Sequence, residues 1–354
     1  MKALVLAGGA GTRLRPLSYS MPKQLIPIAN KPVLQHIVES IRDLGVTEIG
    51  IVVGSGNTDL ADAMGDGSRY GVAFTWIVQE RPLGLAHAVR VAGPYLGDSD
   101  FMMYLGDNML PDGVADMAAD FATARPAAQL VVSRVPDPRA FGVAELNDAG
   151  RVVRLTEKPE QPRSDLALTG VYFFTPAIHR AVENVTPSAR GELEITDAIQ
   201  LLIDDGHTVR AGRYRGYWKD TGRAEDVLDC NRHLLRSLRS RLAGHIGDGC
   251  EISGAVVIEE GARVLRSRIT GPVVIGAGTV VEDSHIGPGT CVAADCTLRG
   301  VELSDSIVLD GATLSGVSGL YGSVIGRHAS VTSGESPERH RLLVGDHTRI
   351  EVAA

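Results

Sequence analysis

The sequence predicts an α/β fold in two parts: a Rossmann-like, doubly wound mixed sheet, then a left-handed parallel β-helix of hexapeptide repeats. Over residues 1–240, short apolar runs alternate with helix-like segments, which is typical of a sheet flanked by helices. After that, an isoleucine, valine or leucine recurs at about every sixth residue, a spacing that fits neither a helix nor a plain hairpin. We therefore expect one domain over residues 1–240 and a second over residues 241–354.

Strands of the first domain are predicted where apolar runs stand between turn residues. They are Lys2–Ala7, Glu48–Gly54, Thr75–Gln79, Phe101–Gly106 and Gln129–Val135. Strands joined by helices need crossover connections, so we expect a largely parallel sheet that binds its ligand beyond the carboxyl ends of the strands.

Helices are predicted between these strands. One runs from Pro32 to Leu44, with a proline at its start and Gly45 after its end. Another runs from Gly84 to about Tyr95, and a third, Gly222–Arg241, leads out of the first domain.

The β-helix prediction depends on one apolar series. It contains Ile246, Ile252, Ile258 and Val264, resumes at Ile275 and Val281, slips by one residue, and continues at Ile286, Val292 and Leu298. Glycine often follows the apolar residue, as at Ile246-Gly247 and Ile325-Gly326. A β-sandwich is a distant alternative, because sandwiches do not hold a six-residue period.

Composition narrows the functional class. The chain has 354 residues, 44% of them hydrophobic and 22% charged, which indicates a globular protein rather than a disordered one. No apolar run approaches the roughly 20 residues of a membrane span, and the first strand meets glycines too soon for a signal peptide, so we expect a cytoplasmic protein. The net charge of -8 argues against nucleic acid as a partner.

The four cysteines, Cys230, Cys250, Cys291 and Cys296, show no CxxC spacing. We therefore expect free structural thiols rather than a disulfide or a zinc site.

A glycine loop with two cations follows the first strand. It reads Gly8-Gly9-Ala10-Gly11-Thr12-Arg13-Leu14, and Lys23 follows between two prolines. Glycines let backbone amides approach a polyphosphate. The loop matches neither a dinucleotide-binding motif nor a P-loop, because Leu14 stands where the former needs its last glycine and the required lysine and serine or threonine are missing for the latter.

This stretch resembles the signature of the sugar-1-phosphate nucleotidylyltransferases, G-G-x-G-T-R-L-x-P followed by P/S-K-x-x-x-P. Further segments resemble the family's landmarks in order: 79–86 for the base, 105–108 for the metal, 141–145 and 157–159 for the sugar, and then 188–197 and 218–222. Within the family, the branch that acts on dTTP and glucose-1-phosphate, in its long form with a β-helix tail, is most similar. Phe141 replaces the tyrosine common in short-form relatives, and His87 stands where many of them carry glutamine; no role is assigned to His87.

The resemblance implies roles that fit an in-line attack of a sugar phosphate on a nucleotide α-phosphorus, a reaction of positioning and charge stabilisation. Arg13 and Lys23 would act on the phosphates as catalytic residues, together with Asp107. Asp107 and Asp220 would hold Mg²⁺, a hard cation that takes oxygen ligands.

The remaining implied roles concern substrate binding. The nucleotide would lie along Leu6, Gly8, Gly11, Thr12 and Gln24, with Gln79, Pro82 and Gly84 near the base. Lys158 and Arg190 would bind the sugar's phosphate, and Gly142, Glu157, Leu168 and Tyr172 would line the sugar site.

Alternatives remain open at this point. The chain could use UTP or GTP with another sugar-1-phosphate, forming UDP-glucose or GDP-mannose. It could carry an acyltransferase in the β-helix, for which His245, His285 and His328 are candidate bases. A non-enzymatic sugar-nucleotide sensor is a minor option, which retention of both candidate metal carboxylates opposes. The faces of the β-helix and the resemblance to the family both favour a homo-oligomer. No membrane partner is expected.

Overall fold

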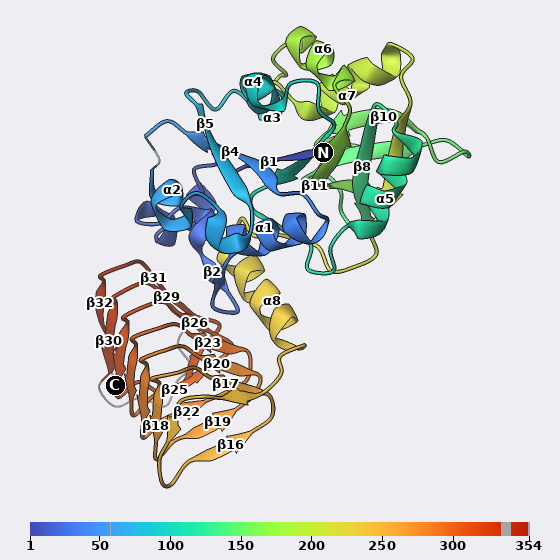
Figure 1. Ribbon diagram of the computed structural model, residues 1–354. Coiled ribbons are helices and arrows are strands. Elements are labelled where there is room, and N and C mark those ends of the chain that lie inside the picture. The colour runs from blue at the N-terminus through green and yellow to red at the C-terminus, as the bar shows by residue number, and fades with distance from the viewer. Residues whose placement is uncertain (57, 334–340, 353–354) are drawn as a thin grey trace. The chain divides into compact units, whose positions relative to one another are not determined.

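The computed structural model of the chain (Figure 1) describes residues 1–56, 58–333 and 341–352. The chain forms two compact units, which we call the sheet unit (residues 1–9 and 34–219) and the β-helix unit (residues 10–33 and 220–354). Compactness therefore groups the stretch 10–33 and the helix after residue 220 with the β-helix. The predicted boundary between residues 240 and 241 divides the chain by fold type and stays a prediction.

A nine-stranded sheet forms the centre of the sheet unit, with its main path in the order β10-β9-β11-β6-β1-β4-β5; β8 joins the sheet beside β11, and β12 pairs with β8. The strands are β1 (Lys2–Leu6), β4 (Glu48–Gly54), β5 (Ala73–Gln79), β6 (Phe101–Leu105), β8 (Ala128–Arg134), β9 (Gly142–Leu146), β10 (Val152–Glu157), β11 (Leu166–Phe174) and β12 (Val209–Arg213). Each of the five predicted strands is present, with ends that shift by at most two residues.

The sheet is mixed, as the predicted fold class stated, but it has more antiparallel pairs than a largely parallel sheet would have. β1 is parallel to β4 and β6, but β11 is antiparallel to its partners β6, β8 and β9. The short connection from Leu146 to Val152 makes β9 and β10 an antiparallel hairpin, since a parallel crossover needs a dozen or more residues, and β11 pairs antiparallel with the other side of β9.

Helices cover both faces of the sheet, as a doubly wound fold requires. Phe174 packs into the core cluster that also holds apolar residues of α3, α6 and α7, whereas its neighbour Phe173 faces the other way and stacks on Phe121 of α5, with ring centroids 5.5 Å apart. The helices are α1 (Val33–Asp43), α2 (Asp59–Met64), α3 (Leu85–Val91), α4 (Gly93–Leu96), α5 (Ala115–Ala124), α6 (Ala177–Asn184), α7 (Ile195–Asp204) and α8 (Ala224–Leu235). No helix of the described residues is long and apolar enough to span a membrane.

Three predicted helix bounds were wrong. Pro32 belongs to the short strand β3 (Lys31–Pro32), which pairs with β2 (Pro27–Ile28), so α1 begins at Val33. The helix predicted from Gly84 is interrupted at Ala92, before Gly93 and a proline. The helix predicted to reach Arg241 ends at Leu235, where successive i to i−3 hydrogen bonds tighten the chain.

The β-helix unit contains three stacks of short parallel strands (Figure 1). The first stack is β14 (Arg241–Leu242), β17 (Val256–Ile258), β20 (Val273–Ile275), β23 (Thr290–Val292), β26 (Ile307–Val308), β29 (Val324–Ile325) and β31 (Leu343–Val344). The second is β15 (His245–Ile246), β18 (Arg263–Leu265), β21 (Val280–Glu282), β24 (Thr297–Arg299), β27 (Thr313–Ser315), β30 (Ser330–Ser333) and β32 (Arg349–Val352). The third is β16 (Glu251–Ser253), β19 (Arg268–Thr270), β22 (His285–Ile286), β25 (Glu302–Ser304) and β28 (Leu320–Tyr321). The predicted parallel β-helix is confirmed, and its left-handedness stays a prediction.

The repeat is not uniformly six residues. Ile258, Val264, Ile269 and Ile275 follow one another at intervals of six, five and six, so Ile258 pairs with Ile275 one coil later, after seventeen residues. The predicted series therefore missed Ile269, which left a gap between Val264 and Ile275, and it recorded the later five-residue interval from Val281 to Ile286 as a slip. The short interval is a tight corner in which Arg266 takes a φ of 46°.

Buried serines connect successive coils at these corners. The amide of Ser284 donates to Ser267 Oγ at 3.0 Å, and the amide of Val301 donates to Ser284 Oγ at 3.0 Å. Each hydroxyl donates in turn to a carbonyl of its own coil, Ser284 to Glu282 at 2.7 Å. The corners thus satisfy backbone groups that the short strands leave outside the stacks.

Candidate active site

From Ala10 onward, the glycine loop lies in the β-helix unit, and it packs against Lys23. Gly11 has a φ of 61°, and a Cβ added there would lie 3.2 Å from Ser18 Cβ and 3.3 Å from Lys23 Cβ. Ser18 Oγ donates to the Gly11 carbonyl at 2.6 Å, which closes the loop on itself. The predicted residues Gly11, Thr12 and Lys23 are therefore drawn into one neighbourhood, and Gln24 is buried beneath it.

Arg13 and Asp220 also meet in this unit. Arg13 Nη2 lies 3.7 Å from Asp220 Oδ2, and the Arg13 side chain is 58% exposed. A Cβ on Gly222 would lie 2.6 Å from Arg13 Nη2 and 3.0 Å from Asp220 Oδ1, so only glycine leaves room for both groups. An exposed guanidinium at this long ion-pair distance can turn to a phosphate.

In the sheet unit, Asp107 follows the carboxyl end of β6. Leu105 pairs with Leu6 across the neighbouring strand β1, and the Gly106 amide donates to the Leu6 carbonyl at 2.9 Å. A Cβ on Gly106 would lie 2.9 Å from that same oxygen, so glycine is needed for the close approach. The ends of β1 and β6 thus place Leu6, Gly8 and Asp107 at one edge of the sheet, where ligands bind in such folds.

Two residues without an assigned role support Asp107. Asn108 Nδ2 donates to Asp107 Oδ1 at 3.0 Å, and Asn108 Oδ1 accepts from Trp218 Nε1 at 2.8 Å. The Trp218 ring lies 5.0 Å from that of Phe141, centroid to centroid. A phenylalanine at this position therefore packs against Trp218. The chain of contacts orients the carboxylate, and no sequence pattern shows it because Trp218 is 110 residues from Asn108.

The predicted base segment centres on Gln79. Its side chain is buried, its Nε2 lies 3.3 Å from the Gly84 carbonyl, and the same nitrogen lies 2.8 Å from His87 Nδ1. A carbonyl only accepts hydrogen bonds, so the amide nitrogen must face Gly84, and His87 must accept through a neutral ring. Burial, together with the charge of Arg90, lowers the pKa of His87 and keeps it neutral. His87 is the positioning residue that the sequence did not reveal.

The base segment is hydrogen-bonded to the predicted sugar-phosphate segment. Leu193 donates to the Leu83 carbonyl at 2.7 Å and accepts from Ala86 at 3.0 Å. Gly84, between them, has a φ of 110°, and a Cβ there would lie 2.7 Å from the Leu193 nitrogen. Pro82 is exposed beside this contact.

Glu157 joins the predicted sugar-binding residues. Arg190 Nη1 lies 3.5 Å and Lys158 Nζ 3.8 Å from Glu157 Oε1, and Thr196 Oγ1 donates to Oε2 at 3.3 Å. A Cβ on Gly142 would lie 3.1 Å from Glu157 Oε2 and 2.7 Å from Leu168 Cδ1, so the glycine makes space for the carboxylate.

Acidic neighbours balance Arg190. Its Nη1 donates to Glu194 Oε1 at 3.1 Å and its Nη2 to Glu192 Oε1 at 3.3 Å. Burial and the nearby charge of Glu157 raise the pKa of Glu194. Two exposed cations, Arg190 and Lys158, thus stand over a carboxylate cluster, which suits a ligand with both a phosphate and hydroxyl groups.

Tyr172 is a buried member of the predicted sugar-site residues. It is 3% exposed and stacks on Phe174 with centroids 5.9 Å apart, within the sheet core. Burial and the charge of Glu157 raise its pKa. Leu168 is 5% exposed in the same core cluster, so both residues belong to the buried core beside Glu157 rather than to an exposed surface.

The cysteines are free thiols, and the candidate histidines of the β-helix lie in different strands and corners. All four cysteines are free, as expected, and Cys291 is fully buried, which raises its pKa to about 12. His328 sits in a corner with a φ of 53° and stacks on His347 of the next coil, with centroids 5.1 Å apart. His245 and His285 lie in separate strands. In the described part of the chain, no three His, Cys, Asp or Glu residues form a group that could hold a metal ion.

Comparisons with known proteins show the family to which the chain belongs. The Nucleotidyl transferase family model matches residues 2–237. Glucose-1-phosphate thymidylyltransferases of Streptomyces griseus and Streptomyces antibioticus are 52% and 51% identical to the chain; the first alignment covers 100% of both chains and the second 99%. A solved structure from Bacillus anthracis is named as a glucose-1-phosphate thymidylyltransferase in complex with a sucrose. It is 31% identical to the chain with a TM-score of 0.63, and the alignment covers 68% of this chain and 97% of that one. Because the family model matches more than half of its length, the chain belongs to the nucleotidyl transferase family, as its motifs predicted.

Proposed function

We propose that the protein transfers the thymidylyl group of dTTP to glucose-1-phosphate, giving dTDP-glucose and pyrophosphate. The observation that carries this is the hydrogen bonding of the Gln79 base segment to the Arg190–Leu193 segment, which joins a base-reading amide to a phosphate-binding cluster. The choice of dTTP and glucose-1-phosphate is supported by relatives of that name that align over the whole chain.

The reaction forms a bond between an oxygen of the sugar phosphate and the α-phosphorus of dTTP, and breaks the bond from that phosphorus to pyrophosphate. Both substrates are anions, so the protein must reduce their repulsion. Arg13 and Lys23 would bind the triphosphate, and Lys158 and Arg190 the phosphate of the sugar. A phosphate nucleophile is ionised at neutral pH and needs no general base.

Asp107 and Asp220 suit Mg²⁺ in their chemistry. Both are carboxylates, which supply the oxygen ligands that this ion takes, commonly one or two carboxylates completed by substrate phosphates. The missing Cβ of Gly222 leaves space beside Asp220 Oδ1. When bound, the ion would neutralise charge on the reacting phosphates. Asp107 and Asp220 would hold it, with Asn108 and Arg13 as their respective neighbours.

The orientation of the Gln79 amide favours recognition of a pyrimidine base. Its Nε2 is engaged by Gly84 and His87, which leaves Oε1 to accept the N3–H of thymine. Adenine has no proton on its ring N1 and would leave this buried oxygen unpaired, which typically costs about 1–3 kcal/mol or more. Thymine and uracil differ by one methyl group, so discrimination there should be about 1–3 kcal/mol at most.

The test is kcat/KM for dTTP, UTP, GTP and ATP, each with glucose-1-phosphate and with mannose-1-phosphate, measured by pyrophosphate release. We expect dTTP with glucose-1-phosphate to be best, UTP to be usable, and both purine nucleotides to be poor. A preference for GTP with mannose-1-phosphate would overturn the proposal. The homo-oligomeric state and the cytoplasmic location stay predictions.

A further inference from the structure

We propose that the β-helix positions the phosphate-binding loop (residues 10–33), and that Asn30, Asn231 and Arg327 are positioning residues for the nucleotide. This inference rests on the proposed role of Arg13 and Lys23 in binding the triphosphate. It goes beyond that role because it gives the β-helix a part in nucleotidyl transfer.

The first contact holds the tip of the loop. Ala29 and Asn30 form the turn between β2 and β3, with φ values of 51° and 58°. Asn30 Nδ2 donates to the Val292 carbonyl in β23 at 2.7 Å. The Ala29 amide donates to Asn231 Oδ1 at 2.8 Å, and Asn231 Nδ2 donates to the Gly289 carbonyl at 2.9 Å. The turn is therefore hydrogen-bonded both to α8 and to one coil of the β-helix.

Asn231 is well suited to this task because it is fully buried. Its Oδ1 also accepts from Cys291 Sγ at 3.1 Å, so the amide is fixed from the loop, the coil and the thiol. A buried amide whose hydrogen bonds are all made is held rigidly. If it loses one partner, a buried polar group is left without a hydrogen bond, which destabilises the folded protein.

The second contact holds the middle of the loop from another coil. Arg327 Nη2 donates to the Ser20 carbonyl at 2.9 Å. The guanidinium is fixed by Asp346, whose Oδ2 lies 2.8 Å from Arg327 Nε and whose side chain is 1% exposed. A Cβ on Gly345, next to Asp346, would lie 3.4 Å from Pro16 Cβ, so the coil also packs against the loop.

The two contacts lie on either side of Lys23 in the sequence, at Ser20 and at Asn30. Lys23 is in turn packed against Gly11. A loop held on both sides of Lys23 loses less freedom when it binds a ligand, so these contacts should raise nucleotide affinity through preorganisation.

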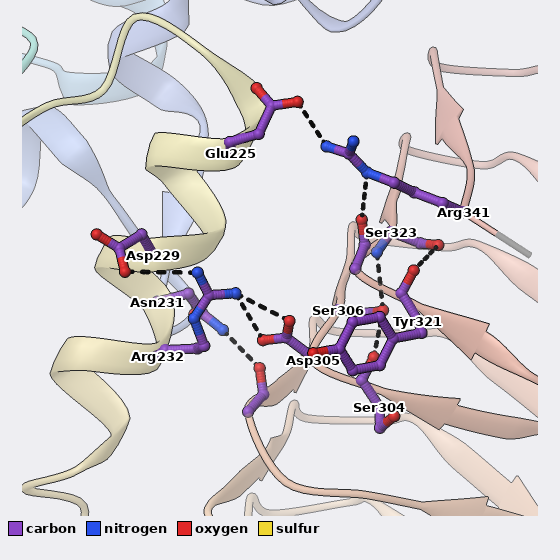
Figure 2. A network of polar contacts seen from close by, with 12 residues as sticks. Glu225, Asp229, Asn231, Arg232, Ser304, Asp305, Ser306, Tyr321, Ser323 and Arg341 are labelled. Atoms are coloured by element: carbon purple, nitrogen blue, oxygen red, sulfur yellow. Dashed lines mark hydrogen bonds and ion pairs between the residues drawn. The ribbon is translucent and has the colours of Figure 1, made fainter. Parts of the chain in front are cut away.

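Other contacts of α8 attach it to the β-helix without touching the loop, and they supply the control. Figure 2 shows Arg232 paired with Asp305 and Arg341 paired with Glu225. The closest nitrogen–oxygen distances are 2.8 Å in the first pair and 2.6 Å in the second. If the β-helix contacts served only to join parts of the unit, breaking Glu225–Arg341 would have the same consequence as breaking Asn30–Val292.

The main variant is Asn30→Gly in the full chain. Glycine adopts a positive φ readily, so the turn is kept and only the side-chain contact is lost. Arg327→Lys keeps the charge beside Asp346 but loses the planar fork that reaches Ser20. The matched control is Arg341→Ala. For each variant, KM is measured for dTTP and for glucose-1-phosphate, and the Kd of dTTP with Mg²⁺ is measured by calorimetry.

We expect Asn30→Gly and Arg327→Lys each to raise KM and Kd for dTTP by roughly 3- to 10-fold, the effect of one hydrogen bond, with KM for glucose-1-phosphate unchanged. In the wild type, dTTP should also slow hydrogen exchange at residues 289–292, and Asn30→Gly should abolish that protection. Arg341→Ala should change none of these quantities.

The proposal is overturned if Asn30→Gly leaves dTTP affinity unchanged, if both KM values rise together, or if Arg341→Ala behaves like Asn30→Gly. Failure of the proposed function is recognised separately. If the wild type prefers another nucleoside triphosphate, the same variants are compared with that nucleotide, and the positioning role stands or falls on their result.

Discussion

At the scale of single residues, the site depends on side chains that orient others. Gln79 has one amide orientation because Gly84 and His87 both engage its nitrogen. Asp107 is oriented by Asn108, which Trp218 orients in turn. No sequence motif marks these supporting residues, because each acts through a contact with a residue that only the folded structure places beside it.

His87 predicts a pH dependence. The pKa of His87 lies below its ordinary 6.5, so Nδ1 is a lone-pair acceptor at neutral pH. As pH falls through that lowered pKa, Nδ1 gains a proton and faces the Gln79 Nε2 donor, which breaks the contact. We expect kcat/KM for dTTP to lose roughly 3- to 10-fold once the pH falls below that lowered pKa.

The matched variant is His87→Gln, whose carbonyl can accept from Gln79 but does not titrate in this range. Since dTTP and glucose-1-phosphate titrate equally in both assays, the ratio of wild-type to variant kcat/KM isolates His87. That ratio should fall from pH 8 to pH 5. A ratio that stays flat would show that His87 protonation does not matter.

Asp107→Asn tests the proposed metal ligand. The substitution removes a charge from the ligand set, and we expect kcat to fall by at least ~10²-fold. Asp112→Asn is the control, because its amide oxygen can still accept the hydrogen bond that Asp112 takes from the Tyr217 amide at 3.0 Å. Both variants should fold, as judged by their thermal midpoints. Near-normal turnover by folded Asp107→Asn at saturating Mg²⁺ would exclude it as a ligand.

At the scale of elements, the corners of the β-helix set the repeat. A corner such as Arg266–Ser267 between β18 and β19 needs one residue with positive φ and one buried hydroxyl. The same pair of features recurs at Asp283 and Ser284, and again at Asp305 and Ser306. The hydroxyl accepts an amide from the next coil, so corner chemistry keeps successive coils in register.

Ser284→Ala should therefore destabilise the β-helix. The Val301 amide, buried with Ser284 as its acceptor, would lose its partner, at a cost of about 1–3 kcal/mol. The measurement is the unfolding midpoint in urea, compared with that of Ser315→Ala, an exposed serine on β27. Equal midpoints for the two variants would mean that the serine contacts contribute nothing to stability.

At the scale of the whole molecule, segments that are neighbours in sequence do not always belong to the same compact unit. The loop 10–33 follows β1 in sequence but is compact with residues 220–354. Contacts with a separation of more than 250 residues, such as Asn30 to Val292 and Ser20 to Arg327, hold it there. The proposed positioning role of the β-helix depends on these two contacts.

The sequence determined the family, the five sheet strands and the β-helix, because each depends on local information: a glycine loop with cations at fixed spacing, runs of apolar residues, and a short period. It also named Arg13, Asp220, Glu157, Lys158 and Arg190, and the structure brings these together as two groups, one in each unit. Roles for these residues remain proposals.

Only the tertiary structure decided what depends on distant pairs. Three features are set by the path of the backbone through the folded protein. They are the antiparallel pairing of β11, the five-residue corner at Ile269 and the hydrogen-bond partners of Gln79. The attachment of the loop to Val292 and Arg327 follows from packing between segments more than 250 residues apart. Local patterns record which residues a short segment needs, but a hydrogen bond across such a separation leaves no periodicity to read, because either partner looks like an ordinary polar residue in its own neighbourhood.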